Sequence, residues 1–220
     1  MARNEQRMAM LDISQLDFGS RNDGDKKLPH PTLRLLSQFV RSPRSVGAVL
    51  PSSRGLAKLM VARVDFTQPS VIVEYGPGTG TITSCIVERL QPHSRYLGIE
   101  TNKRLFDDMA IRFPHLKLVN RNAAEIESIL KSLQIGPVDA ILSGIPWASL
   151  PAGLQPEILD GAVRSLRPGG LFVTFAYVPG LLLPAAQTLR RQLKARFSKV
   201  QTSRVIWHNL PPAFTYVCHR

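Results

Sequence analysis

The chain has 220 residues, enough for one domain with a sizeable core plus an extension, and its 44% hydrophobic content is ordinary for a globular protein. Two cysteines, Cys85 and Cys218, are too few for a disulfide framework. The apolar run over 171–186 is interrupted by proline and glycine and is too short to span a bilayer. No signal peptide is evident, so we expect a cytoplasmic protein or one attached to the inner face of the cytoplasmic membrane.

The formal net charge of +12 comes from both flanks of the sequence. Residues 1–25 carry 3 basic and 5 acidic groups, 26–63 carry 8 and none, 64–160 carry 8 and 11, and 161–220 carry 9 and none. If the two basic segments meet in space, they form a positive face that attracts the phosphates of lipid head groups or nucleic acid. A basic surface without a partner is the alternative, because charge alone does not select one.

The N-terminal part of the chain is expected to lie outside the main domain. Residues 1–27 are polar and mixed in charge, which predicts a mobile tail. Residues 28–66 predict a basic helical extension, whose first helix begins near Pro31 and either packs on the core or lies at a membrane interface. A second helix is predicted from Ser53 to about Val64.

The loop before that second helix combines arginines with hydroxyl groups. Arginines, hydroxyls and backbone amides together can bind a phosphate group. The candidates for such a site are Arg44, Ser52, Ser53 and Arg54. The alternative is that Ser52 or Ser53 caps the helix.

The main domain, predicted over 67–220, opens with a strand that breaks into a glycine-rich turn. Val71 to Val73 are β-branched and continuous, as a parallel strand covered on both faces requires. Glu74 follows at the strand's carboxyl end, and Gly76, Gly78 and Gly80 precede a helix predicted to run to about Leu90. The spacing fits neither a dinucleotide fingerprint nor a phosphate loop. Ligands of α/β sheets bind beside such turns, so this is the predicted cofactor site.

A second acidic residue follows the next predicted strand, 95–99. Glu100 lies about 20 residues beyond the glycines, where a carboxylate can accept hydrogen bonds from both hydroxyls of a ribose. The strand, the glycines and the spaced acid resemble the cofactor motifs of class I S-adenosylmethionine methyltransferases. The resemblance implies S-adenosylmethionine as cofactor and Glu74 facing its amino acid part. The alternative is a tight strand-turn-helix without a ligand.

A helix is predicted over 102–112 and a strand over 116–119, and Asn122 follows that strand. Class I methyltransferases place a residue that contacts adenine at this point, usually Asp; Asn122 can still accept through its side-chain carbonyl. The cofactor-binding residues that the resemblance implies are Glu74, Tyr75, Gly76, Gly78, Gly80, Glu100, Thr101, Asn122, Ala123 and Ser143.

A fourth predicted strand, 138–142, leads into the segment SGIPW at 143–147. This segment parallels motifs of enzymes that methylate amino nitrogens, where a backbone carbonyl and a small polar side chain accept hydrogen bonds from the amine. The ring of Trp147 can surround an ammonium by cation–π attraction, worth ~0.5–2 kcal/mol. Tyr177 is a second candidate for the same pocket, and the alternatives are a core tryptophan and a structural tyrosine. The predicted catalytic residues are Ser143, Pro146, Trp147 and Tyr177.

The remaining elements complete an α/β pattern. We expect a helix over 155–166, a turn over 168–170 into a strand over 171–176, a basic helix over 187–197 and a closing antiparallel hairpin of 200–207 with 214–219. This order predicts a Rossmann-like, mostly parallel sheet of seven strands with helices on both faces. The five histidines show no spacing typical of a metal site, so no metal is expected.

The segments SVGAVLPSS, EYGPGTG, SGIPW, FAYVP and HNLPPA together resemble the small peripheral phospholipid N-methyltransferases of bacteria, over about residues 30–219. Those enzymes convert phosphatidylethanolamine to phosphatidylcholine through mono- and dimethyl intermediates. The resemblance implies that the basic extension binds anionic membrane and helps to cover the active site, and that the four predicted catalytic residues line the head-group pocket. In-line transfer to a neutral amine would follow, with water or Tyr177 taking the amine's proton.

Three other functions stay open. An RNA adenine N6-dimethyltransferase shares the glycine motif, although Ser143 stands in place of the usual Asn and no helical RNA-binding domain follows the hairpin. The acceptor could instead be a soluble amine or another small metabolite. Outside enzymes, a cofactor-binding membrane adaptor without catalysis would carry the same cofactor motif.

Overall fold

A computed structural model of the chain describes residues 53–147, 150–151, 153–182 and 184–220. The predicted tail over 1–27, the helix that begins near Pro31, and the phosphate-binding candidates Arg44 and Ser52 lie outside the described residues.

Seven strands form one sheet in the order β3-β2-β1-β4-β5-β7-β6. The first five strands are parallel to one another, and β7 runs antiparallel to both of its neighbours, β5 and β6. This arrangement confirms the predicted Rossmann-like sheet with its closing antiparallel hairpin. The strands are β1 (Val71–Tyr75), β2 (Arg95–Ile99), β3 (Lys117–Val119), β4 (Val138–Ser143), β5 (Leu166–Tyr177), β6 (Lys199–Thr202) and β7 (Ala213–His219).

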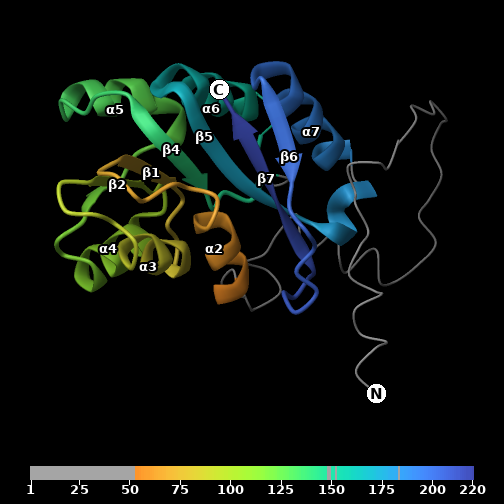
Figure 1. Ribbon diagram of the computed structural model, residues 1–220, viewed down its shortest axis with the longest axis horizontal. Coiled ribbons are helices and arrows are strands. Elements are labelled where there is room, and N and C mark those ends of the chain that lie inside the picture. The colour runs from red at the N-terminus through yellow and green to blue at the C-terminus, as the bar shows by residue number, and fades with distance from the viewer. Residues whose placement is uncertain (1–52, 148–149, 152, 183) are drawn as a thin grey trace.

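Helices cover both faces of the sheet. Figure 1 shows α5, α6 and α7 on one side and α2, α3 and α4 on the other. The helices are α2 (Arg54–Val61), α3 (Thr81–Val87), α4 (Lys103–Arg112), α5 (Ile126–Ser132), α6 (Leu154–Ser165) and α7 (Pro184–Arg196), with short 3₁₀ helices η2 (Ala123–Glu125) and η4 (Val178–Leu182).

The strands divide the buried apolar residues between two cores, because successive side chains of a strand point to opposite faces. The α6-side core takes Val73 and Tyr75 from β1 and packs them with Phe172. The α3-side core takes Ile72 from the same strand and packs it with Leu142, Val173 and the buried face of α2. We predicted α2 as part of an extension outside the domain, yet Leu56 and Met60 of this helix are fully buried in the α3-side core.

The structure departs from the sequence-based prediction at three elements. β5 begins at Leu166, where a turn over 168–170 was expected, and its pairing with β4 shifts register between Val138 and Ala140. Helix α5 was not predicted. β6 ends at Thr202 instead of residue 207, because the chain then leaves the sheet in a loop. None of the helices in the described ranges is long and apolar enough to cross a membrane.

Candidate active site

The two motifs singled out in the sequence meet at the carboxyl ends of β1 and β4. Tyr75 and Ser143 are partners in the register of these strands, and the Gly144 amide donates to the Tyr75 carbonyl oxygen over 2.8 Å. A Cβ on Gly144 would lie 2.7 Å from the carbonyl oxygen of Gly76. The glycine turn and the SGIPW segment are therefore packed backbone against backbone, in a contact that only glycine permits at residue 144.

The glycine turn has the backbone conformation that its residue types predict. Gly76, Gly78 and Gly80 have φ angles of 66°, 58° and 79°, in the left-handed region that favours glycine. Gly80 is restricted by packing as well, since a Cβ there would lie 2.7 Å from the sulfur of Met109 on α4. The turn therefore brings partly exposed backbone to the sheet edge at Gly76 and Gly78, and the missing side chain at Gly80 lets α4 pack close to it.

Glu100 ties the glycine turn to the end of β2. Its Oε2 accepts from the Gly78 amide over 3.1 Å and its Oε1 from the Asn102 amide over 2.8 Å. The residue is 7% exposed, so this carboxylate is fixed at the rim of the sheet. Each oxygen retains a further lone pair for a ligand hydroxyl. The neighbouring Thr101 is exposed, and its carbonyl oxygen accepts from the Asn120 side chain over 3.2 Å.

Glu74 lies beneath the turn, buried on the α3 side of the sheet, and not at the open edge where the sequence suggested it. Its Oε2 accepts from the Tyr96 hydroxyl over 2.6 Å and from the Thr83 hydroxyl over 2.8 Å. Burial raises the pKa of this carboxyl to about 7, against its two hydrogen bonds. Its Oε1 is buried and has no hydrogen-bond partner among the described residues.

Gly98 makes the contact between Tyr96 and Glu74 possible. It is the register partner of Glu74 on β2, and a Cβ there would lie 2.9 Å from the Tyr96 hydroxyl and 2.5 Å from the Leu118 side chain. Without that Cβ, the Tyr96 ring can lie along its own strand and reach the carboxylate.

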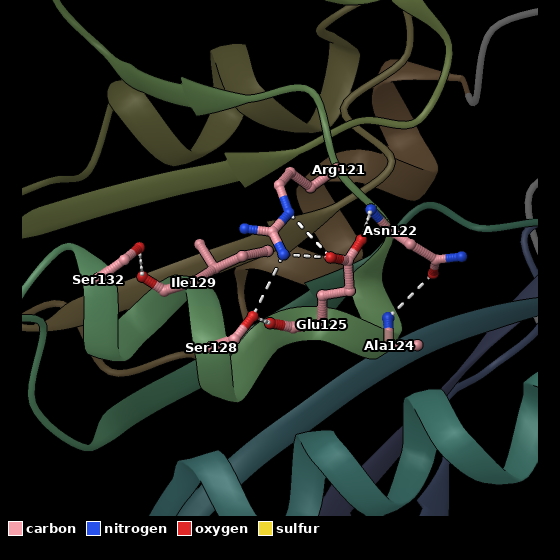
Figure 2. A network of polar contacts seen from close by, with 7 residues as sticks. All are labelled: Arg121, Asn122, Ala124, Glu125, Ser128, Ile129 and Ser132. Carbon is pink, nitrogen blue, oxygen red and sulfur yellow. Dashed lines mark hydrogen bonds and ion pairs between the residues drawn. The ribbon is translucent and has the colours of Figure 1, made fainter.

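Asn122 is used by the protein itself, as Figure 2 shows. Its side-chain oxygen accepts from the Ala124 amide over 3.0 Å, and its own amide donates to Glu125 over 3.0 Å, a capping box that starts η2. The Arg121 guanidinium also binds the Glu125 carboxylate, with Nε at 2.9 Å. The oxygen that we expected to accept from adenine is therefore engaged, and the side-chain nitrogen is the group that points away from the network in Figure 2. Ala123 beside it is 4% exposed.

The side chain of Tyr75 does not belong to the predicted cofactor site. It is fully buried in the α6-side core, edge-on to Phe172 with ring centroids 6.5 Å apart. Burial, with a smaller contribution from Glu127, raises the pKa of its hydroxyl well above the usual range. Only the backbone of this residue reaches the site, because its side chain points to the opposite face from that of Glu74.

Trp147 is likewise a core residue in this structure. It is 3% exposed, its ring lies edge-on to Phe172 at 6.0 Å, and its indole nitrogen donates to Thr174 over 2.9 Å. The Gln155 side chain donates to the Trp147 carbonyl over 2.7 Å. The core alternative therefore describes Trp147 better than a place in a head-group pocket, since the indole is covered and its donor is satisfied.

The two aromatic residues among the predicted catalytic residues lie on opposite faces of the sheet. Tyr177 packs against the α3-side core, edge-on to Phe175 at 5.4 Å, whereas Trp147 belongs to the α6-side core, so the two rings do not share a pocket. Burial raises the pKa of the Tyr177 hydroxyl. Ser143 is fully buried, its Oγ accepting from the Ile145 amide at 3.4 Å, and Pro146 is exposed.

Ser53 and Arg54 are engaged in contacts at the start of α2. The Ser53 hydroxyl oxygen accepts from the Leu56 amide over 3.2 Å, which confirms the capping alternative for this residue. Arg54 forms an exposed ion pair with Glu88 at 2.8 Å. The Ser53 amide donates over 3.2 Å to the side chain of Asn209, whose own amide donates to the Pro211 carbonyl over 2.6 Å. Ser53 is thereby joined to the loop that contains Asn209 and Pro211.

Sequence reasoning missed several residues that position the site. Their roles depend on contacts between distant segments, although a glycine inside a predicted strand was an available signal of close approach at Gly98. These residues are Thr83, Tyr96, Gly98, Gln155, Thr174 and Asn209.

The described residues fit S-adenosylmethionine better than a metal. A fixed carboxylate at the β2 end, left-handed glycines at the β1 end and an unpartnered carboxylate oxygen beneath them offer acceptors for ribose hydroxyls and an amino group. No group of three or more His, Cys, Asp or Glu in the described ranges could hold a metal ion.

Comparison with known proteins supports an S-adenosylmethionine-dependent methyltransferase. No family model matches the chain. The Ornithine lipid N-methyltransferase of Singulisphaera acidiphila is 27% identical over 186 residues, which are 83% of this chain and 93% of the relative. An O-methyltransferase from Bacillus cereus, solved in complex with SAH, is 15% identical and superposes over 94% of each chain with a TM-score of 0.61. The N-methyltransferase NodS from Bradyrhizobium japonicum is 14% identical, with a TM-score of 0.59 over 76% of this chain and 92% of that one.

Proposed function

We propose that this class I S-adenosylmethionine-dependent methyltransferase transfers methyl groups to the amino head group of a membrane lipid. Within that class we favour phosphatidylethanolamine and its mono- and dimethylated forms, with phosphatidylcholine as the end product. The observation that carries the lipid proposal is the match to a lipid N-methyltransferase over 83% of this chain and 93% of that relative.

The distribution of charge supports a membrane surface as the place of reaction. Residues 161–220 carry 9 basic and no acidic groups. On α7 and β6, which contact each other, Arg191, Lys194 and Lys199 are exposed and have no ion-pair partner among the residues described. Each basic side chain near a bilayer adds ~1 kcal/mol of attraction to anionic lipid. The basic residues over 26–63 would add to this attraction as a peripheral membrane anchor.

The residues of the site would hold the cofactor and orient the amine. Bound S-adenosylmethionine supplies an electrophilic methyl group on a sulfonium. Glu100 would hold the ribose, and the glycine turn would lie against the cofactor along its backbone. The part of the SGIPW segment that is at least partly exposed, 144–146, would accept hydrogen bonds from the amine through backbone carbonyls. Positioning of the two reactants supplies most of the acceleration in such a transfer.

Loss of the amine's proton is assigned to water in this mechanism. The sequence alone left water and Tyr177 as alternatives. Because burial raises the pKa of Tyr177, its hydroxyl stays protonated near neutral pH. Tyr177 can therefore accept a hydrogen bond from the amine, but it is a poor acceptor for the proton itself.

A second candidate acceptor is the primary amine of an ornithine lipid. This acceptor is favoured by the relative that matches the chain over 93% of its own length, because that relative is named an ornithine lipid N-methyltransferase. Both lipids present a primary amine at the membrane surface, so the same site chemistry serves either one. RNA adenine and soluble amines have weaker support and become outcomes of the test.

Methyl transfer from labelled S-adenosylmethionine should be measured with four acceptors. These are phosphatidylethanolamine and ornithine lipid, each in vesicles with phosphatidylglycerol, soluble phosphoethanolamine, and RNA. We expect label in extracted lipid and in neither soluble amine nor RNA, and none with the Glu100→Ala variant. Label only in ornithine lipid would keep the lipid class and replace the substrate. Label only in phosphoethanolamine or RNA would overturn the lipid proposal.

A further inference from the structure

The loop between β6 and β7, residues 203–212, presents large apolar side chains to solvent. Trp207 is 55% exposed and Leu210 is 70% exposed. Among the described residues the other large apolar side chain of this kind is Ile111, which lies on α4 next to β3, at the opposite end of the sheet order. Singly exposed apolar residues are normal on a protein surface, but two such large side chains in one short loop mark it as a candidate contact surface, called the apolar patch below.

Backbone and side-chain contacts hold this loop in shape. The Ile206 amide donates to the Ala213 carbonyl over 2.7 Å, and the Ser203 amide donates to the Thr215 carbonyl over 2.9 Å. Asn209 is 3% exposed and is bonded at both ends of its side chain, to the Ser53 amide and the Pro211 carbonyl. Because Ile206 and Asn209 are held inward, Trp207 and Leu210 are presented outward by a preformed backbone.

The loop lies at the same edge of the sheet as the candidate active site. β7 is antiparallel to β5, so its first residue, Ala213, is paired with Tyr177 at the carboxyl end of β5. The Val178 amide donates to the Pro212 carbonyl over 2.8 Å. Figure 1 shows the loop between β6 and β7 beside α2. A surface that contacts this loop therefore faces the edge where the glycine turn ends.

The charges around the apolar patch select the kind of partner. Arg204 and His208, three residues before and one residue after Trp207, are exposed within the loop. The surrounding segment, 161–220, has no acidic residue. An indole and an aliphatic side chain flanked by the Arg204 guanidinium and the His208 imidazole, both of which can donate hydrogen bonds, match the interface of an anionic bilayer, where tryptophan rings lie at head-group depth and basic side chains meet phosphates.

We propose that the loop over residues 203–212 docks on an anionic lipid bilayer, with Trp207 and Leu210 entering the interface and Arg204 and His208 contacting lipid phosphates. The role of this docking rests on the proposed function, because docking at this edge would bring the amine of a membrane-anchored lipid to the site. The binding itself requires no catalysis, so it can be tested separately.

Tryptophan fluorescence gives a direct test, because the chain has two tryptophans and the other, Trp147, is 3% exposed. The full chain is titrated with vesicles of phosphatidylglycerol and phosphatidylcholine. We expect the emission to shift to shorter wavelength and to be quenched by lipids brominated near the head of the acyl chain. The Trp207→Ser and Leu210→Ser variants should each lose about tenfold in vesicle partitioning, the effect of leaving one large apolar side chain unburied. The matched control Ile111→Ser should partition like the parent chain, and all variants should keep cofactor affinity.

Four results would overturn the docking proposal. They are vesicle binding without a change in emission, equal partitioning of Trp207→Ser and the parent, Trp207 emission (parent minus Trp207→Ser) that is already shifted and resists soluble quencher without vesicles, and quenching by RNA in place of lipid. The third would mean that another part of the chain or a second copy covers the loop. Docking without label in lipid would overturn the lipid substrate alone, whereas label in lipid with unimpaired Trp207→Ser would overturn the loop alone.

Discussion

The backbone amide of Gly144 donates to the carbonyl oxygen of Tyr75 over 2.8 Å, between the ends of two adjacent parallel strands. The contact joins the segment expected to orient the acceptor with the turn expected to hold the cofactor. It leaves no room for a side chain on Gly144, whose Cβ would meet the Gly76 carbonyl oxygen at 2.7 Å. Backbone atoms therefore fix the position of the expected cofactor-binding turn relative to the segment expected to orient the methyl acceptor.

Gly144→Ala should disrupt this contact. The added methyl group must displace backbone, and such overpacking costs ~1–3 kcal/mol of unfolding free energy. We expect a matching loss of cofactor affinity, because the displaced atoms belong to the glycine turn. Urea unfolding and calorimetric titration with S-adenosylmethionine measure the two effects. Gly136→Ala is the control, since its Cβ would meet nothing within 4 Å; equal behaviour of the two variants would contradict the prediction.

Glu100→Gln should weaken cofactor binding and also lower the unfolding free energy, because one backbone amide at this largely buried site loses its acceptor. The amide keeps one acceptor oxygen and replaces the other by a donor, which faces either the Gly78 or the Asn102 amide. A bound cofactor would also lose the charged acceptor of its ribose hydroxyls, and a hydrogen bond to a charged group contributes ~1.5–3 kcal/mol, so the Kd should rise about 10- to 100-fold. Calorimetry measures it, and Glu88→Gln, which alters an exposed ion pair with Arg54, should bind like the parent. Unchanged affinity in Glu100→Gln would remove this residue from the cofactor site.

Glu74 should make stability depend on pH in a defined direction. Its pKa is raised from 4.5 to about 7 in the folded chain, chiefly by burial. The folded state therefore binds more protons than the unfolded state between these values, and unfolding free energy falls as pH rises through that range. The full contribution is present below pH 4.5 and amounts to about 3 kcal/mol.

The Glu74→Gln variant isolates this dependence, because its amide does not titrate. Unfolding by urea should show the variant gaining stability relative to the parent as pH increases from 4.5 to 8, most of it below about 7. Glu88→Gln, in which the exposed carboxylate is removed, serves as the control. Parallel curves for Glu74→Gln and the parent would show that the carboxyl titrates alike in both states.

Trp147→Phe distinguishes a core role from a head-group role for this residue. Because Trp147 is a core residue hydrogen-bonded to Thr174, replacing it by Phe should lower the unfolding free energy by ~1–3 kcal/mol. The KM for the lipid amine should stay nearly unchanged. Thr174→Val should destabilise by a similar amount, because it leaves the indole donor buried without a partner. A raised KM with unchanged stability in Trp147→Phe would support the head-group role instead.

The architecture was predictable because its signals are local. The β-branched run at Val71, the glycines that follow it and the terminal hairpin each specify their own element, and the observed strand order agrees. Helix α5 lacked such a signal, since its seven residues are too few to show a clear period. The start of β5 was hidden because Pro168 and Gly169 predict a turn even where the chain pairs irregularly with β4.

The site was predictable in its backbone and less so in its side chains. The ends of the predicted strands specify where the glycine turn and Glu100 lie. The face of the sheet to which the Tyr75 and Trp147 side chains point depends on the exact register of each residue and on contacts with residues far along the chain. Asn122 has the residue type that a ligand contact or a helix cap requires, and the cap uses it here. Two roles compatible with one residue type cannot be separated without the contacts.

The position of β7 between β5 and β6 affects the order in which the chain can be assembled during synthesis. Residues 171–177 of β5 pair with residues 213–219, so the hydrogen-bonding edge of β5 stays open until the ribosome has released those later residues. An open, apolar strand edge is a site for pairing with other chains. Nascent chains stalled before residue 213 therefore expose the unpaired edge of β5 on a nearly formed sheet. Chaperones that bind extended apolar segments should associate with these chains at β5.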